Sequence, residues 1–156
     1  MKLFGDFGAT DSFELIPAVR TPTGSCVDED GCTWEAVTLC AFAQLKDTKT
    51  KVSFLACMDE KDGSPTSAGK SCSAAASIDY TAVETCVSGS ESKKLLADAS
   101  KSFNDKCPGR TTIPHTFVND ADVQPSYSSL SKALCAAGST APVCKQSEAA
   151  SKSCIV

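Results

Sequence analysis

The sequence predicts a mixed α/β domain that is cross-linked by disulfides. Apolar residues recur at helical spacing in several segments, short apolar runs bounded by turn residues have the pattern of strands, and ten cysteines occur in 156 residues. The length fits one domain, and a hydrophobic fraction of 42% is enough for a buried core.

The first part of the chain predicts a strand and then a helix. Phe13–Val19 is a short apolar segment that runs into turn-forming residues, which is typical of a strand. From Thr33 onward, apolar positions follow helical spacing up to Lys46. Val52–Met58 is compatible with a buried strand or a buried helix, and we favour the helix.

The middle of the chain predicts an exposed loop and two helices. Lys61–Gly69 has the composition of an exposed loop, and a Cys57–Cys72 bridge that closes this loop is one plausible pairing. Asp79–Val87 and Glu91–Phe103 each place apolar residues along one side of a helix. Cys107, Pro108 and Gly109 then break the chain.

The last part predicts a hairpin and a final helix. Ile113–Val118 has the pattern of a strand entered through a proline, and Asn119 with Asp120 predicts a turn. Ser126 is a candidate N-cap for a helix that ends near Gly138. Cys135 and Cys144 flank the following loop closely enough to staple it, and a polar tail remains.

The cysteines indicate an oxidising compartment and structural disulfides. Each bridge can contribute about 2–4 kcal/mol by restricting the unfolded chain. No C-x-x-C pair is present, so we predict no metal site and find no dithiol for redox catalysis. The lone histidine, His115, is expected to be a packed or edge residue rather than a ligand or base. The disulfide candidates are Cys26, Cys32, Cys40, Cys57, Cys72, Cys86, Cys135 and Cys144, whereas Cys107 or Cys154 could be a free thiol.

Charge and hydropathy limit the partners. The formal net charge is −4 with both signs interspersed, so no basic stripe is available for nucleic acid and no polybasic patch for a membrane surface. No run of about 18 apolar residues predicts a membrane helix. No phosphate-binding loop appears, and we predict no cofactor. The N-terminus has no continuous apolar stretch of a secretory signal, although the cysteines favour secretion.

The order of several motifs resembles the gamma-interferon-inducible lysosomal thiol reductase family. The matching parts are Cys26–Cys40, Cys57 with Met58, Cys86, the segment 113–119, and Cys135 with Cys144. In that family a CQHG signature is followed by Cys, Asn and Cys. Here Cys26–Glu29 stands at the position of CQHG, and Cys32–Cys40 keeps the later spacing but has Glu35 where asparagine is expected.

The resemblance implies a thioredoxin-like α/β fold with a helical insertion over residues 1–144, followed by a polar tail over 145–156. Phe13–Val19 corresponds to a family strand, and Met1–Phe4 to the end of the helix that carries the catalytic C-x-x-C. The dithiol and the first, central strand are then expected upstream of this chain, with no catalytic residue in it. Ile113 and Pro114 match the substrate-facing cis-proline loop; the alternative is an ordinary trans proline that opens an edge strand.

The implied function is the reduction of disulfide-bonded protein substrates in a secreted or endolysosomal setting. The alternative is a redox-inactive secreted binding protein on the same scaffold. A third hypothesis is a small disulfide-stapled binding domain unrelated to thioredoxin. A missing central strand would leave unpaired sheet edges, so we expect residues 1–156 alone to fold poorly or to self-associate.

Overall fold

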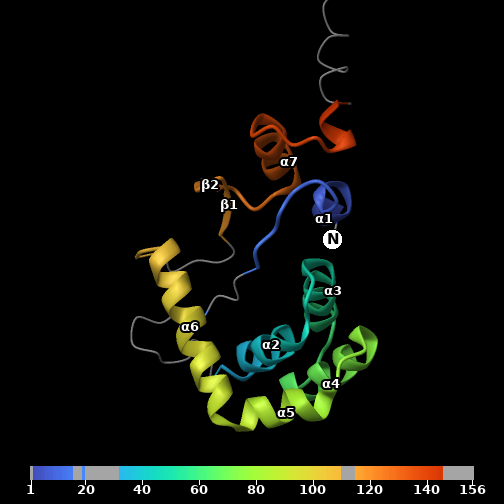
Figure 1. Cartoon of the computed structure of the whole chain (residues 1–156), viewed down its shortest axis with the longest axis vertical. Coiled ribbons are helices and arrows are strands. Elements are labelled where there is room, and N and C mark those ends of the chain that lie inside the picture. Colours follow the sequence, from blue (N-terminus) through green and yellow to red (C-terminus); the bar gives the residue numbers. More distant parts are fainter. Residues whose placement is uncertain (1, 16–18, 20–31, 110–114, 146–156) are drawn as a thin grey trace, which may run out of the picture. The chain divides into compact units, whose positions relative to one another are not determined.

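The computed structural model describes residues 2–15, 19, 32–109 and 115–145, and its described part is mostly helical with one two-stranded antiparallel sheet (Figure 1). The elements are α1 (Lys2–Phe7), α2 (Thr33–Gln44), α3 (Thr48–Asp59), α4 (Pro65–Ala76), α5 (Tyr80–Ser88), α6 (Ser90–Lys106), β1 (Thr116–Val118), β2 (Ala121–Val123) and α7 (Tyr127–Ala136).

The chain forms two compact units. Unit 1 comprises residues 1–13 and 112–156, and unit 2 comprises residues 14–111. Unit 2 therefore holds the five helices α2 to α6, whereas unit 1 joins α1 to the hairpin and α7. The predicted end of the domain at residue 144 stays a prediction, because residues 146–156 lie outside the described residues.

Helix α2 is the central element of unit 2, because α4, α5 and α6 all pack against it (Figure 1). Its side chains are buried over most of its length, which is the arrangement expected for a helix enclosed by others. The core around it combines residues from α2 to α5, among them Val37, Phe54, Met58 and Val83. The helix predicted from Thr33 and the helix favoured for Val52–Met58 are both confirmed.

Side-chain caps fix the starts of three helices of unit 2. Asp47, Ser64 and Asp79 accept hydrogen bonds from backbone N–H groups at the beginnings of α3, α4 and α5. Ser64 is followed by Pro65 at the first helical position, where a proline loses no intrahelical hydrogen bond. The prediction of an exposed loop over Lys61–Gly69 is therefore wrong from Pro65 onward, because Ser64 caps α4 and Pro65 is its first residue.

Gly69 allows α4 to approach α2 closely. A Cβ atom at this position would lie 2.5 Å from Cγ1 of Val37, which is itself 1% exposed. A side chain at position 69 would therefore require the Val37 side chain or one of the two helices to shift.

Helix α6 covers a second part of the core of unit 2. Ala99 is buried together with Val19, Cys32 and Leu39, and Leu95 and Leu96 pack against this cluster. The opposite side of α6 carries the exposed ion pairs Lys94–Asp98 and Lys101–Asp105 at i,i+4 spacing. Both helices predicted between residues 79 and 103 are confirmed as α5 and α6.

The described part of unit 1 contains a β-hairpin, the helices α1 and α7, and a helical turn at residues 142–145. Strands β1 and β2 pair in the register Thr116↔Val123, Phe117↔Asp122 and Val118↔Ala121. Asn119 and Asp120 both have positive φ angles, 47° and 68°, as a two-residue type I′ hairpin turn requires. The predicted turn and hairpin are confirmed.

The last helix of unit 1 also follows the prediction. The hydroxyl of Ser126 caps α7 by accepting the N–H of Ser129, and Gly138 follows the helix with φ 95°. Helix α1 extends to Phe7, beyond the predicted end at Phe4. Phe7 is fully buried and forms the small core of this unit with Ala141 and Cys144.

The strand predicted over Phe13–Val19 is wrong for the residues that the structure describes. Residues 13–15 and 19 have no strand conformation, and the described sheet holds β1 and β2 alone. The apolar character of this segment has another cause, because Leu15 and Val19 pack against the helices of unit 2. A strand also needs a paired neighbour, which burial alone does not supply. The fold is mixed α/β, and the thioredoxin-like arrangement stays a prediction.

Candidate functional site

The Cys40–Cys86 disulfide joins α2 to α5 inside unit 2. The Cα atoms of the two residues are 5.8 Å apart, and their side chains are 1% and 8% exposed. Cys40 lies on the central helix, so this bond ties α5 to the middle of the core. Its burial makes it a structural bond, since a thiolate must reach a sulfur atom before it can exchange.

The Cys57–Cys72 disulfide joins α3 to α4, with Cα atoms 5.7 Å apart. The sequence leaves this pairing as one plausible choice, and the structure confirms it. Because α4 begins at Pro65, the bond links two packed helices rather than the two ends of a long loop. Both cysteines line a cavity of ≈ 490 Å³ whose rim also includes Lys49 and Ser53.

The Cys135–Cys144 disulfide staples the chain after α7 in unit 1. The two Cα atoms are 5.3 Å apart, and residues 142–145 are helical. Cys144 is buried beside Phe7 and Ala141, so the bond also anchors this segment to the small core of unit 1. The staple that the sequence predicts is confirmed.

The remaining cysteines differ from these pairs. Cys32 is disulfide-bonded, whereas Cys26 and Cys154 lie outside the described residues. Cys107 follows α6 and is the free thiol among the described cysteines, with 5% of its surface exposed. The described part of the chain therefore holds no pair of thiols that could act together as a dithiol.

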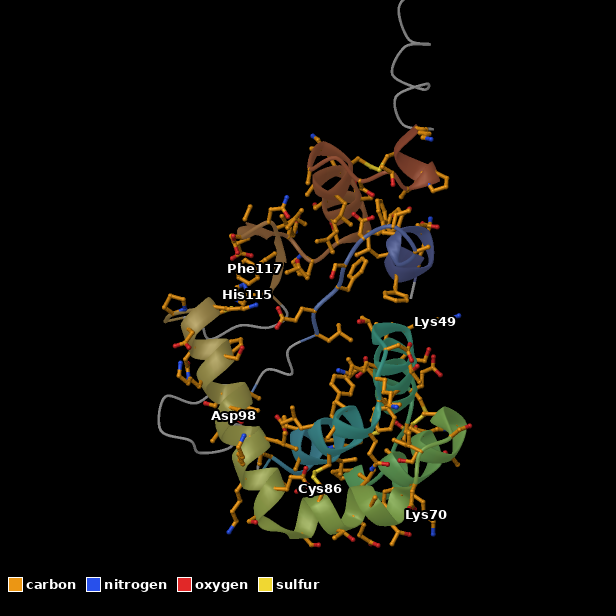
Figure 2. The ribbon with its side chains drawn as sticks, viewed as in Figure 1. Lys49, Lys70, Cys86, Asp98, His115 and Phe117 are labelled. Atoms are coloured by element: carbon orange, nitrogen blue, oxygen red, sulfur yellow. A yellow bond between two sulfur atoms is a disulfide. The ribbon has the colours of Figure 1, made fainter. Side chains whose placement is uncertain are left out.

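The predicted substrate-facing loop cannot be placed, because Ile113 and Pro114 lie outside the described residues. The structure describes His115, which directly precedes β1. Its Nδ1 atom lies 3.3 Å from Oδ2 of Asp122 on β2, and its ring stacks near Phe117 with centroids 6.4 Å apart (Figure 2). The side chain is 12% exposed, so His115 is packed against the hairpin.

Hydrogen bonds and burial shift the pKa values of several polar groups. The hydroxyl and the N–H of Thr50 donate to the Asp47 carboxylate and lower its pKa. The Tyr127 hydroxyl donates to Asp6 over 2.6 Å, and this bond raises the pKa of Tyr127. Burial is the main cause that raises the pKa of Tyr80.

Sequence reasoning missed the contacts that tie the two segments of unit 1 together. Tyr127 donates to Asp6, and Ser139 donates to Asp11 over 2.6 Å. These partners are 121 and 128 residues apart in the chain, and no local pattern signals such a pair. The capping role of Asp47 had a usable signal, since an aspartate directly before a helical segment is a common N-cap.

The described residues show neither a metal centre nor a membrane helix. No group of three or more histidine, cysteine or acidic side chains in this part of the chain could hold a metal ion. None of the described helices is long and apolar enough to cross a membrane. The disulfides indicate an extracellular or otherwise oxidising compartment.

The described cysteine framework cross-links the helices and holds no free pair of thiols. Comparison of the chain with protein-family models, with curated proteins and with solved structures finds no match.

Proposed function

We propose that this chain is a thiol–disulfide oxidoreductase scaffold of the lysosomal thiol reductase type, with disulfide-bonded proteins as substrates. One observation carries the proposal: most of the cysteines on which the resemblance rests act as framework pairs. Cys40 bonds to Cys86, Cys57 bonds to Cys72, and Cys135 bonds to Cys144. Such a framework suits a protein that works in a secreted or endolysosomal compartment.

The proposed chemistry needs a dithiol, and the part of the chain that the structure describes holds none. A reductase attacks a substrate disulfide with one thiolate and releases the product with a second thiol close to it. The sequence has no C-x-x-C pair, and Cys107 is a single buried thiol. We therefore expect no reductase activity from residues 1–156 alone.

The alternative is a redox-inactive, disulfide-rich binding protein on the same scaffold. The cysteines of the described region favour it, because apart from Cys107 they are all in disulfides. On this alternative the bonds only stabilise a surface that binds a partner.

The N-terminal sequence and intact mass of the native protein separate these two functions. A C-x-x-C pair upstream of Met1 supports the reductase, whereas a native chain that begins at Met1 supports the binding protein.

An insulin reduction assay with residues 1–156 tests whether the cysteines in this chain have reductase activity. We expect no turnover from this chain, and the same result from its Cys107→Ser variant. Turnover that the substitution abolishes would contradict the proposal.

The hairpin edges suggest a second property, self-association. In the described sheet β1 and β2 pair only with each other, so each has one open edge, and Phe117 is 40% exposed. We expect the mass from light scattering to rise with concentration and Phe117→Lys to suppress this rise. A concentration-independent monomer that melts reversibly would contradict this part.

A further inference from the structure

We propose that the cavity formed by α3 and α4 is a reaction site for low-molecular-weight thiols of the glutathione kind, which attack the Cys57–Cys72 disulfide in its wall. The cavity has a volume of ≈ 490 Å³, and both sulfur-bearing side chains line it. This volume accommodates a short peptide thiol, and its polar rim is open to solvent through the exposed residues Lys49 and Ser53.

The other two described disulfides do not line this cavity. Cys40 and Cys86 are 1% and 8% exposed, and both belong to the main core of unit 2, which also includes Cys72 but not the half-buried Cys57. In the Cys135–Cys144 bond, Cys144 is 8% exposed and packs with Phe7 and Ala141, whereas Cys135 is half-buried, as Cys57 is. An attacking thiolate must align with the S–S axis at a sulfur that it can reach, so a disulfide with one half-buried cysteine in a cavity wall reacts before one whose two cysteines are both buried in the core.

Burial also selects the sulfur that is attacked. Cys72 has no exposed surface, whereas Cys57 is half-buried. The incoming thiolate therefore forms its bond with Sγ of Cys57 as the bond to Cys72 breaks. The electron pair leaves on Sγ of Cys72, which takes a proton from water.

A second thiol completes the reaction. It attacks the sulfur of the bound thiol, releases the oxidised thiol as its disulfide, and leaves Cys57 reduced. Two molecules of thiol are oxidised, and one protein disulfide is reduced. The reaction is reversible, so the oxidised form of the same small thiol restores the bond.

The charges at the rim affect how a thiolate approaches. Lys49 is an exposed cation at the beginning of α3, and Asp47 contributes a carboxylate that Thr50 holds in place. Lys49 offsets the repulsion that this carboxylate exerts on an anion. Lys70, which lies on α4, is exposed and does not line the cavity (Figure 2).

This reaction site does not rest on the proposed function. Here the protein's own disulfide is the bond that reacts, whereas the proposed function concerns disulfides of other proteins. A chain without reductase activity could still react at Cys57.

The test exposes oxidised residues 1–156 to reduced glutathione, blocks free thiols at successive times, and maps the peptides by mass spectrometry. We expect a glutathione adduct on Cys57 to appear about tenfold faster than any change at the buried Cys40–Cys86 bond, and faster than at Cys135–Cys144, which does not line the cavity. Equal rates at the three bonds, or a first adduct on Cys72, would overturn the proposal.

Two pairs of variants locate the reaction in the cavity. Ser53→Phe fills the rim and should slow adduct formation about tenfold, whereas the same change at exposed Ser71 on α4, outside the cavity, should not. Lys49→Glu should slow the reaction about threefold, and Lys70→Glu should leave it unchanged. If circular dichroism shows that Ser53→Phe does not fold, the comparison of Lys49→Glu with Lys70→Glu tests the proposal instead. Equal rates of adduct formation in these two variants would overturn it.

Discussion

Unit 2 and unit 1 are stabilised in different ways. Unit 2 is continuous in sequence and has an extensive buried cluster that includes Val37, Phe54 and Val83. Unit 1 joins two segments from opposite ends of the chain around a small cluster made of Phe7, Ala141 and Cys144. Because burial of apolar surface supplies most of the folding free energy, we expect unit 2 to be the more stable part.

The disulfides also stabilise the two units in different ways. In unit 2 two bonds cross-link helices that already share a core. In unit 1 the Cys135–Cys144 bond and two side-chain hydrogen bonds, Tyr127 to Asp6 and Ser139 to Asp11, compensate for a small core. Substitutions at these contacts test whether the two units are stabilised differently.

The largest effect is expected when Cys40 and Cys86 are both replaced by alanine. Their sequence separation of 46 residues predicts a loss of about 4 kcal/mol in the free energy of unfolding of unit 2, mainly through the unfolded chain. Trp34 is the one tryptophan of the chain and packs against this core, so its fluorescence in a urea titration reports the loss.

A matched control replaces Cys135 and Cys144, which are 9 residues apart. The shorter loop predicts a smaller loss of about 2.5 kcal/mol, seen as faster hydrogen exchange in unit 1. The comparison fails if the Cys40 and Cys86 substitutions cost unit 2 less than about 1 kcal/mol.

The next effect comes from two glycines in helices. Gly69→Ala should destabilise unit 2 by about 1–3 kcal/mol, because the new Cβ would meet Val37 at 2.5 Å. A Cβ atom added at Gly5 in α1 would meet no atom within 4 Å, so Gly5→Ala should stabilise unit 1 by up to about 1 kcal/mol. Thermal unfolding measures both changes, and a Gly69→Ala chain as stable as the parent would refute the close approach of α4 and α2.

A smaller gain is expected at the hairpin turn of unit 1. Asp120 has φ 68°, a conformation that glycine adopts at no steric cost. Asp120→Gly should stabilise the hairpin by less than about 1 kcal/mol. Hydrogen exchange at the amides of β1 and β2 measures the gain, and faster exchange would show that the turn has another conformation.

The smallest effect is the pH dependence of the Tyr127–Asp6 hydrogen bond. The pKa of Tyr127 is raised in the folded state, chiefly by this bond. Its contribution to stability is therefore complete below the ordinary tyrosine pKa of about 10 and is lost as the pH rises through the higher folded pKa.

Ultraviolet absorbance during an alkaline titration follows both tyrosines. Asp6→Ala should return Tyr127 toward its ordinary pKa and leave Tyr80 unchanged, since burial is the main cause at Tyr80. A titration that Asp6→Ala does not alter would show that the hydrogen bond is not the cause.

The local elements could be predicted from the sequence. Helical spacing identified α2, α5 and α6, and turn residues located the hairpin at Asn119 and Asp120. The spacing of Cys135 and Cys144 predicted the staple that the structure shows. These features depend on residues close together in the chain, which is why a single sequence suffices for them.

The remaining features depend on contacts between distant residues. Nothing local pairs Cys40 with Cys86, and the apolar run at Phe13–Val19 has the same pattern whether it pairs as a strand or packs against helices. The start of α4 was missed because Ser64 and Pro65 have the composition of a loop as well as that of a helix start. The cavity at Cys57 could not be predicted, since it needs the placement of α3 against α4.

The most direct test of the account is a disulfide map of oxidised residues 1–156, with free thiols labelled in denaturant before digestion. We expect the bonds Cys40–Cys86, Cys57–Cys72 and Cys135–Cys144, and a label on Cys107. Different partners for any of these cysteines, or a bonded Cys107, would contradict the claim that this part of the chain holds framework disulfides and no dithiol.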